Sequence, residues 1–197
     1  PLPICGDYNF HADPFFSVDG SKIRLEALDN KTSLGDILEI DIENFSNQRV
    51  LKTGNHFSYP FSFKYNDVEY LLPEVASHSA PYFCEPNERE GNFHFLKGLQ
   101  GKRIVDATMI FWRDYYYLFF GEDSSAHTQL SLWYSSSPFD DFKPHPMNPI
   151  VIDPGSARMG GGILVTSGMM FRFGQNNAGE YGESLAVNEI VKLSAQD

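Results

Sequence analysis

The sequence predicts an all-β protein, a five-bladed β-propeller whose last blade is abbreviated or incomplete. Aromatic residues make up 15% of the chain, beside 16 glycines and 12 prolines, which favours strands joined by tight turns. A strand–turn–strand pattern also recurs. Aligning Asp13, Pro60, Asp106 and Arg158 gives intervals of about 47, 46 and 52 residues. Repeats of that length with strands inside them are typical of propeller blades.

The first two blades are expected at about 11–47 and 49–90, and each begins with a motif that contains proline and aromatic residues. Turn residues then separate apolar runs, with Asp19-Gly20 in the first blade and Asn66-Asp67 in the second. Asp13 is expected at the start of a strand. The other expected strands are 22–28, 35–42, 61–65, 68–72 and 82–84, after an irregular lead-in over residues 1–10 that can end in a strand.

The third blade is the most strongly patterned. Its runs 103–112 and 115–121 are apolar on both faces, as expected for a sheet covered by neighbouring blades, and 129–135 alternates. The fourth blade is expected to contain strands at 163–165, 169–173 and 184–191. No segment has a convincing helical pattern.

No linker divides the chain, so residues 1–197 are expected to form a single propeller domain. At roughly 45 residues per blade the chain provides four blades and a remnant, whereas a closed ring needs its last blade completed. Three explanations remain open: the fifth blade is abbreviated, a second copy of the chain or a partner domain completes the ring, or the chain is a fragment.

Charge and composition exclude some classes of partner. The net charge of −11 argues against a nucleic acid or an anionic membrane surface, and a neutral or cationic ligand fits better. No run of 18 apolar residues occurs, so no membrane span is expected. Cys5 and Cys84 are interpreted as two separate thiols, with a disulfide as the alternative. Nothing in the sequence indicates a compartment.

Two aspartates form the sharpest candidate pair. Equivalent positions of propeller blades meet around one channel, so Asp13 and Asp106 are expected at its mouth, with Arg158 at the same place on another blade. Hydrolysis of a glycosidic bond needs two carboxyl groups, about 6.5–9.5 Å apart for inversion. One activates water and the other protonates the leaving oxygen. The alternative is that each aspartate caps a turn or holds a neighbouring loop.

Glu74 ends an apolar strand, where a carboxyl group can act as a general acid or bind sugar hydroxyls at the rim. Glu26 ends the preceding hairpin in the same way, and for it the rim role is preferred. Arg158 and Arg172 lie beside glycines, which indicate close backbone approach or a bulge. An arginine there can bind a carboxylate or phosphate of the ligand, or form an ion pair with Asp13 or Asp106.

His56, Tyr59 and Gln175 are further candidates for substrate binding. The histidines have no metal-ligand spacing, so neither a metal nor a cofactor is expected. The run Tyr115-Tyr116-Tyr117 can provide stacking platforms for sugar rings, although most aromatic residues in strands belong to the core.

Seven short motifs together resemble one group of proteins, the five-bladed propeller domains related to family-43 glycoside hydrolases. Within that group the sequence is most similar to the propeller domain of glucosamine inositolphosphorylceramide transferase-like proteins. The motifs extend from residue 10 to about residue 193. They are His11-Ala12-Asp13-Pro14-Phe15, Phe57-Ser58-Tyr59-Pro60-Phe61-Ser62-Phe63, Leu72-Pro73-Glu74, Val105-Asp106-Ala107-Thr108, His145-Pro146-Met147-Asn148-Pro149-Ile150, Ser156-Ala157-Arg158 and Tyr181-Gly182-Glu183-Ser184.

The resemblance implies a role for each matching residue. Asp13 matches the general base of the hydrolases, and Asp106 matches the aspartate that tunes the pKa of the acid and orients it. The hydrolases take their acid, a glutamate, from the start of blade four, where this sequence reads Ser156-Ala157-Arg158 and has no carboxylate. Glu74 or Glu183 would then replace the acid, or the site would bind sugar without cleaving it.

Two functions therefore follow from the sequence. The first is a carbohydrate-active enzyme of the glycoside hydrolase type, with Asp13 as base, Asp106 as modulator and Glu74 as acid. The second is a non-catalytic glycan-binding module that accompanies a glycosyltransferase or another sugar-modifying transferase. In both, the expected partner is a carbohydrate.

Overall fold

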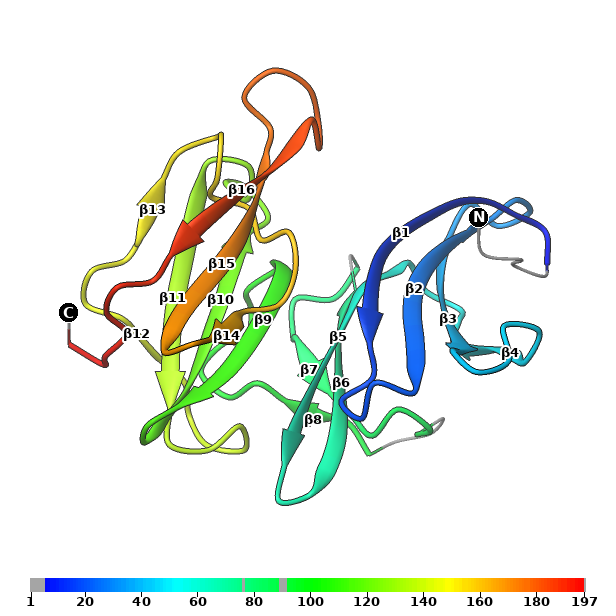
Figure 1. Ribbon diagram of the computed structural model, residues 1–197, viewed down its shortest axis with the longest axis horizontal. Coiled ribbons are helices and arrows are strands. Elements are labelled where there is room, and N and C mark those ends of the chain that lie inside the picture. Colours follow the sequence, from blue (N-terminus) through cyan, green and yellow to red (C-terminus); the bar gives the residue numbers. More distant parts are fainter. Residues whose placement is uncertain (1–5, 76, 89–91, 197) are drawn as a thin grey trace. The chain divides into compact units, whose positions relative to one another are not determined.

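The computed structural model describes residues 6–75, 77–88 and 92–196. Within these residues the chain forms strands, turns and loops and no helix, so the all-β prediction is confirmed (Figure 1). The chain divides into two compact units. The first unit comprises residues 1–78 and 82–94, and the second comprises 79–81 and 95–197. The expectation of a single domain stays a prediction.

The first unit opens with a four-stranded antiparallel sheet in the order β1-β2-β3-β4. Its strands are β1 (Tyr8–Phe16), β2 (Lys22–Asp29), β3 (Gly35–Asp41) and β4 (Gln48–Lys52). Aspartates cap the predicted turns. Asp19 Oδ1 accepts a hydrogen bond from the Ser21 N–H at 2.9 Å, and Asp29 Oδ1 accepts one from the Thr32 N–H at 2.8 Å.

A second hairpin follows in the same unit, formed by β5 (Phe57–Tyr65) and β6 (Val68–Val75). Its turn residues Asn66 and Asp67 have φ angles of 47° and 63°, the left-handed pair of a type I′ turn. A bridge between Leu71 and Cys84 then joins β6 to the segment that contains β7 (Tyr82–Phe83). β7 pairs with β8 (His94–Phe95), where the chain passes into the second unit.

The second unit contains two sheets. The first has the order β12-β11-β10-β9, with β13 also paired to β11. Its strands are β9 (Ile104–Trp112), β10 (Tyr115–Glu122), β11 (Gln129–Ser135), β12 (Lys143–Pro144) and β13 (Val151–Ile152). The second sheet has the order β14-β15-β16, formed by β14 (Leu164–Thr166), β15 (Met169–Asn176) and β16 (Ser184–Glu189).

Most of the predicted strands are confirmed to within a few residues, and the predicted 129–135 coincides with β11. The lead-in ends in a strand, because Tyr8 already pairs with Asp29. The expectation that Asp13 starts a strand is wrong, since β1 begins five residues earlier, at Tyr8. The sequence pattern does not predict β4, β8, β12 or β13, of which the last three have only two residues each. The described residues supply four antiparallel meanders, so a count of five blades stays a prediction.

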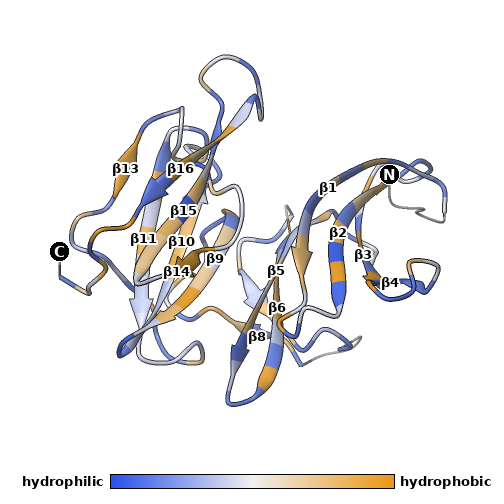
Figure 2. Cartoon of the chain, viewed as in Figure 1, coloured by the Kyte–Doolittle hydropathy of each residue, from blue (hydrophilic) through white to orange (hydrophobic). Residues whose placement is uncertain are grey.

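Apolar side chains cover both faces of β3. Ile37 belongs to a buried cluster with Phe57, Val75, Tyr82 and Cys84. Leu38 and Ile40, on the opposite face, pack with Leu25 and Ala27. The hydropathy along the chain agrees with this burial. Apolar stretches run along strands such as β9, and many hairpin turns are hydrophilic (Figure 2).

Cys84 is buried and is a free thiol, and its burial raises the pKa of that thiol. Cys5 lies outside the described residues. No helix long and apolar enough to span a membrane occurs in the part of the chain that the structure describes.

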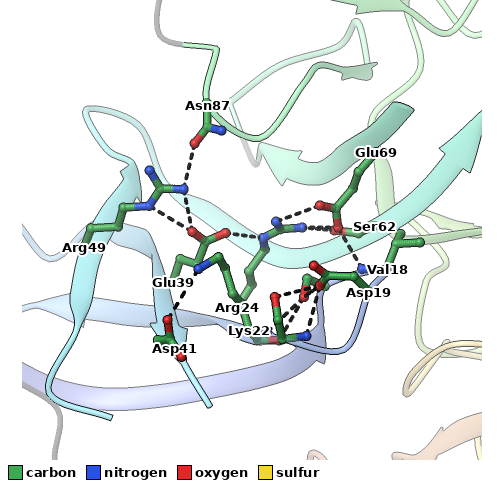
Figure 3. A network of polar contacts seen from close by, with 12 residues as sticks. Val18, Asp19, Lys22, Arg24, Glu39, Asp41, Arg49, Ser62, Glu69 and Asn87 are labelled. Carbon is green, nitrogen blue, oxygen red and sulfur yellow. Dashed lines mark hydrogen bonds and ion pairs between the residues drawn. The ribbon is translucent and has the colours of Figure 1, made fainter. Parts of the chain in front are cut away.

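A buried arginine links the two hairpin systems of the first unit (Figure 3). Arg24 on β2 is 2% exposed and donates to Glu39 Oε2 on β3 at 2.8 Å. It also donates to both carboxylate oxygens of Glu69 on β6, at 2.7 and 3.1 Å, and to Ser62 Oγ on β5 at 2.6 Å. Glu39 accepts two further hydrogen bonds from Arg49. The positive charges of Arg24 and Arg49 are therefore matched by the carboxylates of Glu39 and Glu69, and hydrogen bonds from Arg24 join the two sheets.

We expect Arg24→Met to lower the free energy of unfolding by about 3 to 5 kcal/mol, because it leaves the buried Glu39 carboxylate with one cation fewer. Urea unfolding followed by circular dichroism measures this loss. The matched control is Lys64→Met, which removes an ion pair whose side chains are 51% and 94% exposed and should cost about 0.5 kcal/mol or less. Equal losses in the two variants would contradict the structural importance of the Arg24 network.

Candidate functional site

In three meanders the first strand contains the same irregularity. It is a β-bulge, in which two residues of the first strand lie opposite one residue of the second. In β1 the pairing passes from Ala12↔Glu26 to Phe15↔Arg24, so Asp13 and Pro14 together lie opposite Leu25. β5 and β9 have corresponding bulges, at Tyr59-Pro60 and Asp106-Ala107. Proline has no N–H to donate to the neighbouring strand, and a bulged position does not need one. Proline is therefore tolerated inside such a strand.

The first residue of each bulge has left-handed backbone. The φ angles are 49° at Asp13, 44° at Tyr59 and 52° at Asp106. Residues other than glycine avoid this region at a cost of about 1–2 kcal/mol, and such strain collects at functional sites. The bulges also correct the repeat alignment by one position, because Tyr59 rather than Pro60 is the equivalent of Asp13.

The residue opposite the start of each bulge is also equivalent in the first unit. Glu26 pairs with Ala12 in β1, and Glu74 pairs with Ser58 in β5, so the two glutamates occupy the same place in successive meanders. Glu26 is buried, whereas Glu74 is half-buried.

His56 connects the two meanders of the first unit. Its Nδ1 accepts a hydrogen bond from the Gly35 N–H at 2.9 Å, and its Nε2 lies 3.6 Å from Glu26 Oε1. A Cβ at Gly35 would lie only 2.4 Å from the Phe57 carbonyl oxygen, so this close approach requires glycine. The predicted substrate residue His56 therefore also positions β3 beside β5.

Asp13 and Tyr59 lie on neighbouring strands, since β1 packs against β5. Asp13 is half-buried. Tyr59 is 1% exposed, and its ring meets Phe15 edge-on with 4.8 Å between centroids. Tyr59 thus helps to pack the strands, and its binding of substrate stays a prediction.

In the second unit, the structure joins two of the predicted site residues directly. Arg158 Nε donates to Asp106 Oδ2 at 2.5 Å, with side-chain exposures of 14% for Arg158 and 3% for Asp106. The Arg158 guanidinium also lies over the ring of Tyr181, 5.3 Å from its centroid. Of the alternatives left open for Arg158, an ion pair with Asp106 is the one present.

Arg172 and Gln175 hold the chain that leads to Arg158. Arg172 Nη1 donates to the Ser156 carbonyl at 2.6 Å, and Gln175 Nε2 donates to the Met159 carbonyl at 3.2 Å. Burial lowers the pKa of Arg172, and the charge of nearby Asp153 opposes that shift. A Cβ at Gly174 would lie 2.1 Å from the Ser156 carbonyl oxygen, which confirms the predicted close backbone approach.

The predicted site residues fall into two groups. Asp13, His56, Tyr59 and Glu74 belong to the first unit, and Asp106, Arg158, Arg172 and Gln175 belong to the second. That the two groups share one channel mouth stays a prediction. Within the described residues, no group of three or more His, Cys, Asp or Glu side chains is arranged to hold a metal ion.

The sequence prediction missed Tyr181 as a neighbour of Arg158. Its signal was the motif Tyr181-Gly182-Glu183-Ser184, which the resemblance includes but to which it assigns no aromatic role. The sequence places Glu26 and Glu74 at the ends of successive hairpins, and the strand register adds that each lies opposite the start of a bulge.

Comparison with protein families identifies the chain. The family model described as glucosamine inositolphosphorylceramide transferase 1, N-terminal, matches residues 5–197. The chain belongs to this family. The resemblance seen in the sequence is thereby confirmed.

Curated relatives of the domain carry the same name. Glucosamine inositolphosphorylceramide transferase 1 of Arabidopsis thaliana is 32% identical over 203 residues, which cover 96% of this chain and 26% of that protein. The protein of that name from Oryza sativa subsp. japonica is 29% identical over 211 residues, which cover 99% of this chain and 28% of that protein. The chain thus spans about a quarter of the length of these relatives.

Solved structures of similar fold are family-43 enzymes. An exo-beta-1,3-galactanase from Clostridium thermocellum aligns with a TM-score of 0.65 at 10% identity, covering 93% of this chain and 46% of that chain. A thermostable family-43 glycoside hydrolase aligns with a TM-score of 0.60 at 13% identity, covering 89% and 69%. At such identities the likeness concerns the fold alone. The domain therefore has an all-β fold similar to the family-43 propellers.

We expect Arg158→Met to destabilise the protein by about 3 kcal/mol, because the buried Asp106 carboxylate loses its cation. The same substitution in an Asp106→Asn background should cost at least about 1 kcal/mol less, since no buried charge is then left uncompensated. Denaturant unfolding of the two single variants and the double variant measures this coupling.

Arg103→Met is the matched control, because Arg103 and Asp123 are 3.5 Å apart and more than half exposed. It should change stability by about 0.5 kcal/mol or less. Strict additivity of Arg158→Met and Asp106→Asn would show that the pair contributes nothing specific.

Proposed function

We propose that this domain is a glycan-binding module of a sugar-transferring protein, with the architecture of the family-43 hydrolases but without cleavage of the bound sugar. The family is named for a transferase, whereas the fold is that of hydrolases. The observation that supports binding over cleavage is the ion pair between Arg158 and Asp106.

By the resemblance, the segment Ser156-Ala157-Arg158 stands where the related hydrolases take their general acid, and it has no carboxylate. A guanidinium stays protonated throughout the physiological range, so it cannot donate the proton that a leaving oxygen needs. Asp106, matched to the residue that tunes that acid, is instead bound to Arg158 at 2.5 Å. An arginine with several N–H donors suits the hydroxyl, carboxylate or phosphate oxygens of a ligand.

The relatives' printed name mentions glucosamine and inositolphosphorylceramide. We propose a glycan of that general chemistry as the ligand. In the first unit, Asp13, Glu74 and His56 are proposed to bind hydroxyl groups, with Tyr59 shaping the surface beside them. In the second unit, Arg158 is proposed to bind anionic or hydroxyl oxygens, with Arg172 and Gln175 shaping its surroundings.

A screen against aryl glycosides and oligosaccharides, following both product release and thermal shift, tests the proposal. We expect at least one sugar to raise the melting temperature without product release, and Asp13→Asn to reduce that stabilisation, because it removes a charged hydrogen-bond acceptor. The matched control is Asp67→Asn, which makes the same charge change in a turn where the side chain is 94% exposed. It should leave sugar stabilisation unchanged.

Hydrolysis is the second candidate, with Asp13 as base, Asp106 as modulator and Glu74 as acid. The observation in its favour is that Asp13 and Asp106 share the same strained backbone, which is frequent in active sites. Product release that disappears in both Asp13→Asn and Glu74→Gln would establish hydrolysis and overturn binding without cleavage.

We also propose that the four meanders are blades of a five-bladed ring completed by a second copy of the chain or by a partner domain. The β14-β15-β16 sheet supports this, because it has three strands where the β1-β2-β3-β4 sheet has four. Light scattering after size exclusion distinguishes the two sources. Twice the chain mass would indicate a second copy, and the single chain mass at every concentration would exclude it.

A further inference from the structure

A cavity of about 410 Å³ opens at one end of the first sheet of the second unit. Tyr115 begins β10 at this end, whereas the bulge of Asp106 lies opposite Phe120 near the other end of that strand. The cavity is therefore distinct from the Asp106–Arg158 pair. The residues that line it are Tyr115, Tyr134, Ser135, Ser136, Asp140, Asp141 and Lys143.

Two tyrosines form the aromatic part of the wall. The rings of Tyr115 and Tyr134 are 5.5 Å apart between centroids and lie at 86° to each other, and both residues are half-buried. Tyr117, which is 2% exposed, packs against Tyr115 at 6.2 Å and 67°. Such edge-to-face contacts fix the ring orientations, so the cavity has a preformed apolar surface.

Two carboxylates line the cavity beside the rings. Asp140 and Asp141 are exposed, and Ser136 Oγ lies 3.5 Å from Asp140 Oδ2. Neither carboxylate lies within 4.0 Å of Lys143 or of another cationic group among the described residues. Their oxygens therefore remain available as acceptors for a ligand.

Ser135 is an independent sign of a ligand. This residue is 4% exposed, and its Oγ has no hydrogen-bond partner within the described part of the chain. An unsatisfied buried hydroxyl costs about 1–3 kcal/mol and calls for an explanation. Ser135 is one of the residues that line the cavity, so a ligand there can supply the missing partner.

We propose that this cavity binds a pyranose ring of a neutral saccharide. The apolar face of the sugar would lie against the tyrosines, neighbouring hydroxyls would donate to Asp140 and Asp141, and Lys143 and Ser135 would contact further oxygens. The two carboxylates disfavour an anionic ligand. A volume of about 410 Å³ lies within the range of small-molecule sites.

The inference does not rest on the proposed function, because the two sites share no residue. Isothermal titration and saturation-transfer NMR of the whole chain with methyl glucoside, methyl galactoside and methyl mannoside test it. We expect at least one of these sugars to bind. Tyr115→Ala and Asp141→Asn should each weaken that binding about tenfold, the loss typical of one hydrogen bond to a charged group or one stacking ring.

Matched controls separate this site from the other. Asp123→Asn makes the same charge change as Asp141→Asn in the same unit but outside the cavity, and it should leave affinity unchanged. Arg103→Met, which removes a cation of the same unit that is more than half exposed and lies outside the cavity, should also leave it unchanged. Arg158→Met instead reports on the other site. Circular dichroism confirms that each variant is folded. If Tyr115→Ala unfolds the protein, Asp141→Asn provides the test, because a substitution at this exposed position is not expected to unfold it.

Three results would overturn the inference: no binding of any of the three glycosides at millimolar concentration, binding that persists in both cavity variants, or binding that is lost in Arg158→Met instead. The last result would support the proposed function and remove this site. Binding lost only in the cavity variants would support this site and leave the proposed function to its own screen.

Discussion

The left-handed backbone at Asp13, Tyr59 and Asp106 is the constraint on which the candidate site depends. Each of these residues lies in a β-bulge, where two residues of its strand face one residue of the neighbour. The ladder resumes in register after the bulge, so the strain of the left-handed residue is held by paired strand on both sides. The same bulge occurs in both units. The repeat is therefore clearer in the backbone than in the sequence, where the similarity between repeats is weak.

Buried arginines then tie neighbouring sheets together within each unit. Arg24 reaches from β2 to Glu39 and Glu69, and Arg158 reaches Asp106 on β9. Buried ion pairs add little net stability relative to apolar packing, because desolvation offsets the attraction between the charges. Their effect is on specificity, since any other arrangement of the sheets would leave a carboxylate or a guanidinium buried without its partner.

The Arg158–Asp106 pair also separates fold from chemistry. The fold is similar to that of family-43 hydrolases at 10% identity, and within it the permanent cation of Arg158 is bound to the Asp106 carboxylate. Function resides in the site rather than in the fold. The tyrosine-lined cavity at the far end of β10 shows that one sheet of this kind can hold two chemically different surfaces.

The sequence by itself determined the all-β class, the repeat, most of the longer strands and the turns at Asp19-Gly20 and Asn66-Asp67, because alternation and turn propensity are local properties. It also singled out Asp13, Asp106 and Arg158. Only the tertiary structure decided that Tyr59 takes the bulge position, that Glu26 and Glu74 each lie opposite the start of a bulge and that Arg158 binds Asp106. These facts depend on strand register and on contacts between residues up to 52 positions apart, and a side chain's partner across such a distance is set by packing rather than by its neighbours in sequence.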